Sequence, residues 1–257
     1  MAAVLSKVCA ESLLSLYPVF VKNINAPTLA QMWTRFAAYV AVSLPFVDFG
    51  FVWKQVRSKW GLALAAMTLA HIYTSYVGFQ NMSSGNSFTL FYIYPILILL
   101  FSGKLSVFLG ALAVGAVALL SRGESAYGAA MVGLAALTEA LIYFIVLKIP
   151  SPNSWNHIFL SYFAGAFLLS FLNTGPIADL STTTLLGLGG NAVLGLGGYY
   201  LRFYSMSRLP VVQYALLSNV GIVMSYVYGY GFNGEIPTVG QMVGALAIMA
   251  ACYLAKK

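Results

Sequence analysis

Long apolar stretches, separated by charges, prolines and small polar clusters, follow one another along the whole sequence. A helix needs about 20 mostly apolar residues to cross the hydrocarbon core of a bilayer. The pattern therefore predicts an all-α integral membrane protein of about ten transmembrane helices, with kinks at Pro18 and Pro95. The predicted spans are Ala3–Val21, Ala30–Val47, Trp60–Phe79, Asn86–Phe101, Leu105–Leu120, Tyr127–Leu147, Asn156–Leu172, Thr183–Leu201, Val211–Tyr228 and Val239–Ala255.

The composition supports a lipid-facing surface. Charged residues make up 7% of the chain and hydrophobic residues 60%, whereas soluble domains carry roughly 25% charged residues. The net charge of +7 does not indicate nucleic-acid binding, because the densest basic run, Lys54 to Lys59, is a short connection between two apolar stretches. Cys9 and Cys252 both lie in apolar runs and are expected to pack as small hydrophobic residues.

Neither a metal site nor a cofactor site is expected. The glycine pattern at 187–198 formally fits a dinucleotide fingerprint, but it lies in an apolar stretch without the strand–helix–strand context that the fingerprint requires. Small residues that let membrane helices approach closely explain it better. The chain also has no Walker A motif and no group of catalytic side chains near a membrane surface, so we do not expect an enzyme.

The distribution of basic residues predicts the topology. An even number of spans places both termini on one side, and loops on the cytoplasmic side collect Lys and Arg. One side carries Lys7, Lys54, Arg57, Lys59, Lys104, Lys148, Arg202, Arg208, Lys256 and Lys257. The other side carries Lys22, Arg35 and Arg122. Both termini are therefore expected in the cytoplasm, with the protein in the cell (inner) membrane.

Two weak internal matches divide the chain into related halves, residues 1–125 and 126–257. Phe79 to Ser83 matches Phe203 to Ser207 at an offset of 124 residues, and Glu11 matches Glu139 at an offset of 128. Each half contributes an odd number of spans, so the second enters the membrane from the opposite side. The expected architecture is two inverted five-helix repeats in one membrane domain, a plan that many secondary transporters share.

Several local motifs resemble the ten-helix, EamA-like branch of the drug/metabolite transporter superfamily. They are the Ala26-Pro27-Thr28 turn before Arg35, the stretch from Asn86 through Pro95, and the Gly234-Glu235-Ile236-Pro237-Thr238 turn before the last span. The resemblance covers nearly the whole chain and implies a small-molecule transporter. The first helix around Glu11 also resembles that of the small multidrug resistance proteins, where a membrane glutamate is shared between protons and cationic drugs.

Glu11 and Glu139 are the leading candidates for the site. An ionisable residue inside a span costs roughly 2.5–3.5 kcal/mol on insertion scales and is a functional candidate by default. If both carboxyls face one cavity, they could exchange protons for a cationic solute as a coupled pair. The alternative is that each is protonated and bonds a neighbouring hydroxyl to fix helix packing.

Aromatic and other polar side chains within the spans complete the candidate site. Tyrosines suit a cavity for flat or cationic organic molecules, although an interfacial aromatic belt is the alternative; the candidates are Tyr73, Tyr76, Tyr92 and Tyr94. For Arg35 the resemblance implies a structural or substrate-carboxylate role, and snorkelling to the interface is the alternative. His71 is a candidate proton relay or a packing residue. Asn219 could line the cavity or bond a neighbouring helix.

These features predict a secondary transporter that exports small organic solutes or drugs, coupled to protons, by alternating access. Its expected partners are a small-molecule substrate, protons and the lipid bilayer, with the chain as a monomer or homodimer. Uncoupled movement of an amino acid or similar metabolite is the main alternative. A passive channel is less favoured, because no ring of like charges or carbonyl filter is evident.

Overall fold

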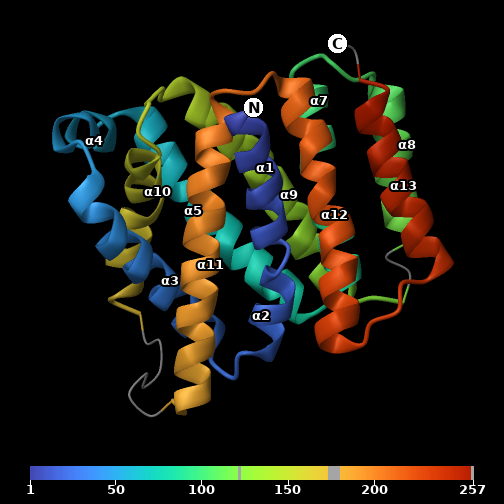
Figure 1. Cartoon of the computed structure of the whole chain (residues 1–257), viewed down its shortest axis with the longest axis horizontal. Helices are drawn as coiled ribbons and strands as arrows, with labels where there is room; N and C mark the ends of the chain where they lie inside the picture. Colours follow the sequence, from blue (N-terminus) through green and yellow to red (C-terminus); the bar gives the residue numbers. More distant parts are fainter. Residues whose placement is uncertain (121–122, 173–179, 256–257) are drawn as a thin grey trace.

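The computed structural model describes residues 1–120, 123–172 and 180–255, and all regular elements in this part of the chain are helices. The long helices lie side by side in one bundle, and the chain begins and ends at the same end of it (Figure 1). In order they are α1 (Ala2–Leu14), α2 (Tyr17–Asn23), α3 (Thr28–Ser43), η1 (Leu44–Phe46), α4 (Phe49–Val56), α5 (Lys59–Gln80), α6 (Ser84–Phe91), α7 (Tyr94–Phe101), α8 (Val107–Leu120), α9 (Ala126–Lys148), α10 (Ser154–Leu169), α11 (Thr182–Met206), α12 (Val211–Asn233) and α13 (Val239–Tyr253).

The predicted all-α membrane fold is confirmed, and every predicted span is helical. The first span is formed by α1 with α2, the second by α3 with η1, and the fourth by α6 with α7, while the others correspond to single helices. Within the described residues, five stretches are long and apolar enough to cross a bilayer by length and composition: Ala2–Asn23, Lys59–Gln80, Ser84–Phe101, Ala126–Lys148 and Val211–Asn233. The short helix α4 was not predicted and occupies the connection before α5, where Asp48 caps it by accepting a hydrogen bond from the Phe51 amide.

Two prolines divide the first and fourth spans. Proline has no N–H to donate and its ring clashes with the carbonyl four residues earlier. Accordingly, α1 ends at Leu14, four residues before Pro18, and α6 ends at Phe91, four residues before Pro95. The predicted kinks are therefore full interruptions, and they place Tyr92 in the break of the fourth span.

The outer surface of the bundle carries large apolar side chains. Leu186, Val193 and Phe171 are each more than 70% exposed. Soluble monomers rarely expose apolar groups over a continuous surface, whereas lipid tails solvate such groups well.

The helix pairing has a two-fold pattern. α1 packs on α11 and α5 packs on α9, so the first span meets the eighth and the third meets the sixth. Other main pairs are α3 with α10, α8 with α13, and α12 with α6 and α7. In addition, α10 packs on α5 as α3 packs on α11, and α1 packs on α12 as α9 packs on α6 and α7. If the first five spans are interchanged with the last five, each of these helix pairs becomes either itself or another pair of the set. The division into two repeats remains a prediction, and this pairing favours it.

Two basic residues that were assigned to the cytoplasmic side lie inside the bundle instead. Lys7 and Arg202 are at most 1% exposed. Arg202 was placed in a loop because the eighth span was ended at Leu201, whereas α11 continues to Met206. Arg122, Lys256 and Lys257 lie outside the described residues, and the orientation in the membrane remains a prediction.

The contact between α5 and α9 predicts a local packing limit. A Cβ at Gly78 would lie 2.5 Å from Cγ2 of Val132 and 3.0 Å from its backbone nitrogen. We expect Gly78→Val to destabilise the protein by about 1–3 kcal/mol through overpacking and to lower Tm in detergent, followed by circular dichroism. Gly133→Val is the matched control, since a Cβ there meets no atom within 4 Å; equal Tm values for the two variants would contradict this packing.

Candidate functional site

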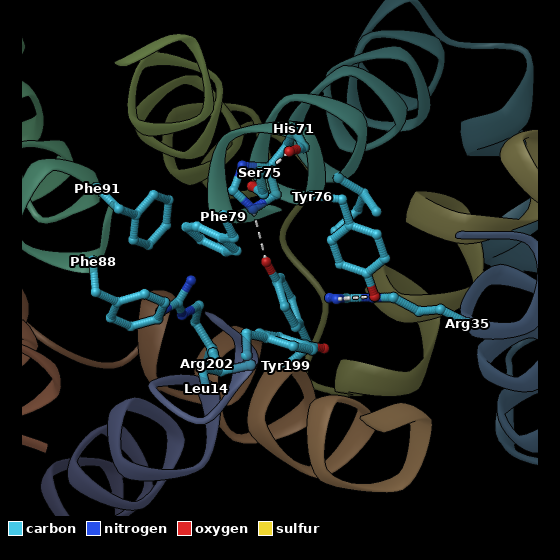
Figure 2. A pocket seen from close by; sticks show the side chains of 12 residues that line it. Leu14, Arg35, His71, Ser75, Tyr76, Phe79, Phe88, Phe91, Tyr199 and Arg202 are labelled. Atoms are coloured by element: carbon cyan, nitrogen blue, oxygen red, sulfur yellow. Dashed lines mark hydrogen bonds between the residues drawn. The ribbon is translucent and has the colours of Figure 1, made fainter. Parts of the chain in front are cut away.

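A small cavity lies at the centre of the bundle, where α1, α2, α3, α5, α6 and α11 meet (Figure 2). Its free volume is about 20 Å³, which is room for a single water molecule. Three basic side chains reach it, namely Arg35, His71 and Arg202. Much of the remaining wall is aromatic: Tyr17, Tyr76, Phe79, Phe88, Phe91 and Tyr199.

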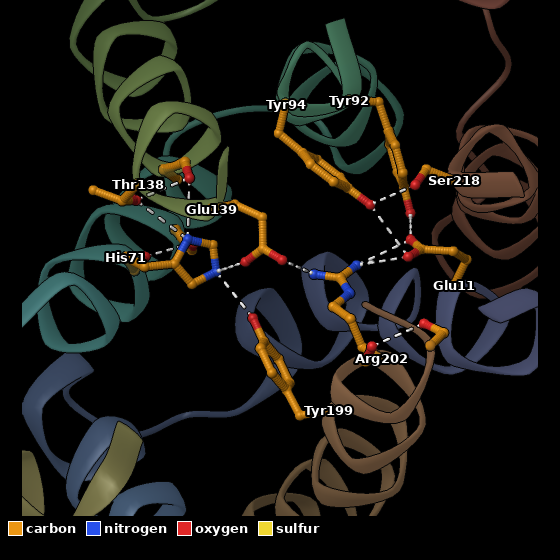
Figure 3. Close-up of polar contacts among 12 residues, drawn as sticks. Glu11, His71, Tyr92, Tyr94, Thr138, Glu139, Tyr199, Arg202 and Ser218 are labelled. Carbon is orange, nitrogen blue, oxygen red and sulfur yellow. Dashed lines mark hydrogen bonds and ion pairs between the residues drawn. The ribbon is translucent and has the colours of Figure 1, made fainter. Parts of the chain in front are cut away.

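Beside the cavity, Arg202 of α11 holds two buried carboxylates (Figure 3). Its Nη1 lies 2.7 Å from Oε1 of Glu139 in α9. Its Nη2 lies 2.9 Å from Oε2 and 3.1 Å from Oε1 of Glu11 in α1. All three side chains are at most 1% exposed. The guanidinium presents its N–H donors as a planar fork and can therefore pair with two carboxylates at once, so Arg202 joins α1 to α9.

Glu11 has a second cationic partner within its own helix. Lys7 lies one turn earlier, is fully buried, and pairs with the Glu11 carboxylate. Residues four apart share one helix face, which makes this pair possible without distorting α1. The Lys7 Nζ also lies 3.5 Å from the ring centroid of Tyr214, a cation–π contact.

The break between α6 and α7 supplies two hydroxyls to Glu11. Tyr92 donates a hydrogen bond to Oε2 at 2.6 Å. The Tyr94 hydroxyl lies 3.2 Å from Oε1 and 2.9 Å from Oγ of Ser218. Gly221 of α12 makes room for Tyr92, because a Cβ at 221 would stand 1.6 Å from the Tyr92 hydroxyl oxygen.

His71 connects the cavity to Glu139. Its Nδ1 lies 3.0 Å from the carbonyl oxygen of Ala135, and since a carbonyl only accepts, Nδ1 carries the hydrogen. In the neutral ring, Nε2 is then an acceptor for the Tyr199 hydroxyl at 3.0 Å. Oε2 of Glu139 lies 3.4 Å from the same nitrogen and has no hydrogen-bond partner. A proton on Nε2 would give this oxygen a donor.

Arg35 of α3 lies in an aromatic cage. Five tyrosine rings have centroids 4.3–5.8 Å from its Cζ: Tyr17, Tyr39, Tyr76, Tyr162 and Tyr199. Its Nη1 and Nη2 each donate to a tyrosine hydroxyl at 3.3 Å, while Nε has no partner. Among the described residues, no carboxylate lies within ion-pair distance of Arg35.

Most of the predicted site residues come together here. Glu11, Tyr92 and Tyr94 meet on one side of Arg202, Glu139 and His71 on the other, and Arg35 and Tyr76 at the far end of the cavity. Tyr73 does not join them: it is 43% exposed and lines an apolar groove on the outside of the bundle. Asn219 is also absent from the cluster, and its neighbour Ser218 is the residue that contacts Tyr94.

The sequence reasoning missed Arg202 and Lys7. Both were treated as loop charges, so the two glutamates were expected to face each other without a cation between them. The stretch Tyr199-Tyr200-Leu201-Arg202-Phe203-Tyr204 has no helix breaker before Pro210, and this continuity was the available signal that α11 extends past the arginine.

A second polar cluster closes the opposite end of the fourth span, around the N-terminus of α6. Glu235 accepts hydrogen bonds from the Ser84 and Gly85 amides, each at 3.0 Å, and its Oε1 lies 3.6 Å from Nζ of Lys22. Glu124 accepts from the Ser83 amide and hydroxyl. Free backbone amides at a helix N-terminus favour negative charge. The two carboxylates therefore tie the turn before α13 and the start of α9 to α6.

The fold and the buried charges define a polytopic α-helical membrane protein with a polar centre, the class to which small-molecule transporters belong. The model of the EamA-like transporter family matches residues 126–256, which is half of the chain. The chain belongs to this family, whose members are transporters and not enzymes. This confirms the resemblance to the drug/metabolite transporter superfamily that the sequence motifs indicated.

The structural comparison supports the fold across both halves. One solved structure, titled only "Crystal structure of protein", is similar with a TM-score of 0.70 and 15% sequence identity. The similarity covers 98% of this chain and 96% of the other. No curated protein matches the chain.

Removing the arginine that bridges the glutamates should destabilise the bundle. Breaking one partner of a buried ion pair leaves an uncompensated charge and costs about 3–5 kcal/mol. We expect Arg202→Gln to lower Tm strongly in detergent, measured by circular dichroism. Arg208→Gln is the control, because Arg208 is exposed and bonds only to backbone carbonyls and a serine hydroxyl. A Tm for Arg202→Gln as high as that of the control would contradict the bridging role.

The hydrogen bonds that Glu124 accepts at the N-terminus of α6 should make the stability of the protein depend on pH. Burial opposes ionisation, but hydrogen bonds from Ser83 and Asn86 outweigh it and hold the pKa of the Glu124 carboxyl below its ordinary value of 4.5. A carboxylate with a lowered pKa stabilises the fold above its ordinary pKa, and this contribution is lost as the pH falls through the folded value. We expect Tm to fall more between pH 5 and about pH 3 in the wild type than in Glu124→Gln. Parallel Tm profiles for the two proteins would count against the cap.

Proposed function

We propose that this protein is a proton-coupled secondary transporter that exports small organic solutes by alternating access. The observation that carries the proposal is the pairing of two fully buried glutamates, one from each half of the chain, with a single arginine beside the central cavity. Ionisable groups inside a bundle of membrane helices mark substrate or proton pathways. Here they also link the helices that would have to move.

Arg202 is the element through which protonation would act. In the structure it pairs with Glu11 of α1 and with Glu139 of α9. A proton on either carboxyl removes the negative charge that attracts the guanidinium and leaves a hydrogen bond to a neutral carboxyl group in place of the ion pair. Protonation would therefore loosen α11 from α1 or from α9, and rocking of one helix group against the other would follow.

His71 offers a route for the proton. It lines the cavity and its Nε2 lies 3.4 Å from the unpartnered Oε2 of Glu139. An imidazole ring can take up a proton at one nitrogen and pass it to a neighbouring group, so it is suited to relay protons. The proton would move from water in an opened cavity to His71 and then to Glu139.

The structure has the geometry of a closed state. A drug-sized solute needs a pocket of about 300 Å³ or more, whereas the central cavity holds about 20 Å³. Substrate would thus enter only after the helices separate on one side. On one side the contacts that would have to open include the Glu235 cap on α6 and the hydrogen bond between Asn23 and Asn233. Because protons flow into an energised cell, exchange would drive the solute outward.

An uncoupled facilitator is the second candidate, and one observation favours it. Both glutamates are already neutralised by basic partners, Lys7 and Arg202. Such pairs are also found where charge serves packing alone. In that case the cluster would shape the pocket without exchanging protons.

Transport by proteoliposomes containing an internal pH dye tests the proposal. With a panel of amino acids, organic acids and aromatic cations, we expect substrate-dependent proton movement in the wild type. Glu11→Gln and Glu139→Gln should each reduce the proton flux at least tenfold, because the amide removes the titrating group while keeping its shape. Asp48→Asn is the matched control: Asp48 is exposed and caps α4 away from the cavity.

One result would decide against coupling, and another would remove the evidence from the glutamine variants. Substrate uptake without proton movement, unchanged in both glutamine variants, would leave the facilitator. An equal loss of proton flux in the Asp48→Asn control would show that the carboxylate-to-amide changes act through folding or insertion. The two glutamine variants would then no longer support the proposal.

A further inference from the structure

Arg35 is a buried cation whose counter-charge is missing from the described part of the chain. It is 2% exposed and its neighbours are phenol rings and hydroxyls. Burying a charge is costly unless it is paired. A guanidinium has five N–H donors, and in Arg35 only Nη1 and Nη2 have partners, at 3.3 Å each. The Nε donor is buried and unpartnered.

The balance of formal charges in the interior points the same way. The buried lysine and arginine residues of the described chain are Lys7, Arg35 and Arg202, and the buried acidic residues are Glu11 and Glu139. With all of them ionised, the interior carries one positive charge in excess. Lys7 and Arg202 are matched by the two glutamates, so the excess belongs to Arg35. One added negative charge would make the interior neutral.

The side chains that line the cavity favour a negatively charged solute. Arg35 and Arg202 both line it, whereas Glu11 and Glu139 lie behind Arg202 and do not. A solute in the cavity thus meets two guanidinium groups and no carboxylate. This arrangement disfavours the cationic drugs that the resemblance of the first helix implies. Phe79, Phe88 and Phe91 form an apolar wall on the side away from Arg35, as Figure 2 shows.

We infer that the transported solute is a small organic monoanion, a carboxylic acid with a flat apolar body. This inference rests on the proposed transport function and names its substrate class. The carboxylate binds the free N–H groups of Arg35, a pairing for which the guanidinium fork is well suited. The apolar body lies against Phe79, Phe88 and Phe91. A phosphate dianion fits less well, because its second charge would leave the interior negative.

Equilibrium binding to the wild-type protein in nanodiscs tests the ligand class without any mutation. The probes are 3-phenylpropanoate, the neutral 3-phenylpropan-1-ol and the cationic 3-phenylpropylamine, with sodium chloride and sodium phosphate as inorganic anions. Binding is measured by isothermal titration calorimetry and by the shift in Tm. We expect the carboxylate to bind at least tenfold more tightly than the alcohol and the amine, and the salts to give no comparable shift in Tm.

Variants of Arg35 then locate the site. Arg35→Gln should abolish the preference for the carboxylate over the alcohol, and Arg35→Lys should retain part of it, because the ammonium keeps the charge but not the fork. The matched control Arg208→Gln should bind as the wild type does. If Arg35→Gln does not fold, the ligand comparison on the wild type stands on its own.

The outcomes separate this inference from the transport proposal. Tighter binding of the amine, an equal response to chloride or phosphate, no binding of the carboxylate at millimolar concentration, or full carboxylate preference in Arg35→Gln would each overturn the assignment. Coupled transport of the amine in proteoliposomes would at the same time support the proposed transport function. Binding of the carboxylate without proton movement would support the inference and point to the facilitator.

Discussion

The structure depends on the pairing of Arg202 with two carboxylates in a medium that does not solvate ions. Burial of each of these charges alone would cost several kcal/mol, and attraction between charges is strong where the effective dielectric constant is low. The guanidinium satisfies Glu11 and Glu139 together and so ties α1, α9 and α11 into one unit. The surrounding tyrosines, the interrupted fourth span and the close approach of Gly221 all serve to bring donors to this cluster.

The contacts around Arg202 and Arg35 are of different kinds, although both are buried arginines that line the same cavity. Arg202 pairs with a carboxylate at each of its two Nη atoms and joins the helices that carry them. Arg35 has ring faces and hydroxyls around it, which solvate a cation without neutralising it. Carboxylates neutralise Arg202, whereas no carboxylate of the described residues pairs with Arg35. Such a centre suits the proposed binding and release of a charged solute, because Arg202 keeps the helices in register while Arg35 can change partners.

The length of the apolar stretches was sufficient to predict the membrane spans as helices, because in lipid every backbone group must be satisfied within its own segment. Pro18 and Pro95 likewise indicated the interruptions at the correct turns. The site was predicted only in part. Glu11, Glu139 and His71 were recognisable as polar residues inside apolar runs, but Arg202 sits at the end of a span, where snorkelling and burial give the same sequence pattern. Whether such a charge faces a loop or the interior depends on which helix lies opposite, and this information is not local.

The pair formed by Lys7 and Glu11 also bears on how the chain enters the membrane. During synthesis α1 emerges before α11, since Arg202 follows 191 residues after Glu11. Without a counter-ion in α1, the Glu11 carboxylate would remain unpaired in the bilayer until Arg202 is inserted, at an energetic penalty that slows insertion. Because Lys7 stands one turn away, α1 carries its own counter-ion and is neutral from the outset. The first helix can therefore integrate as an independent unit, and Arg202 later docks onto acceptors that are already in place.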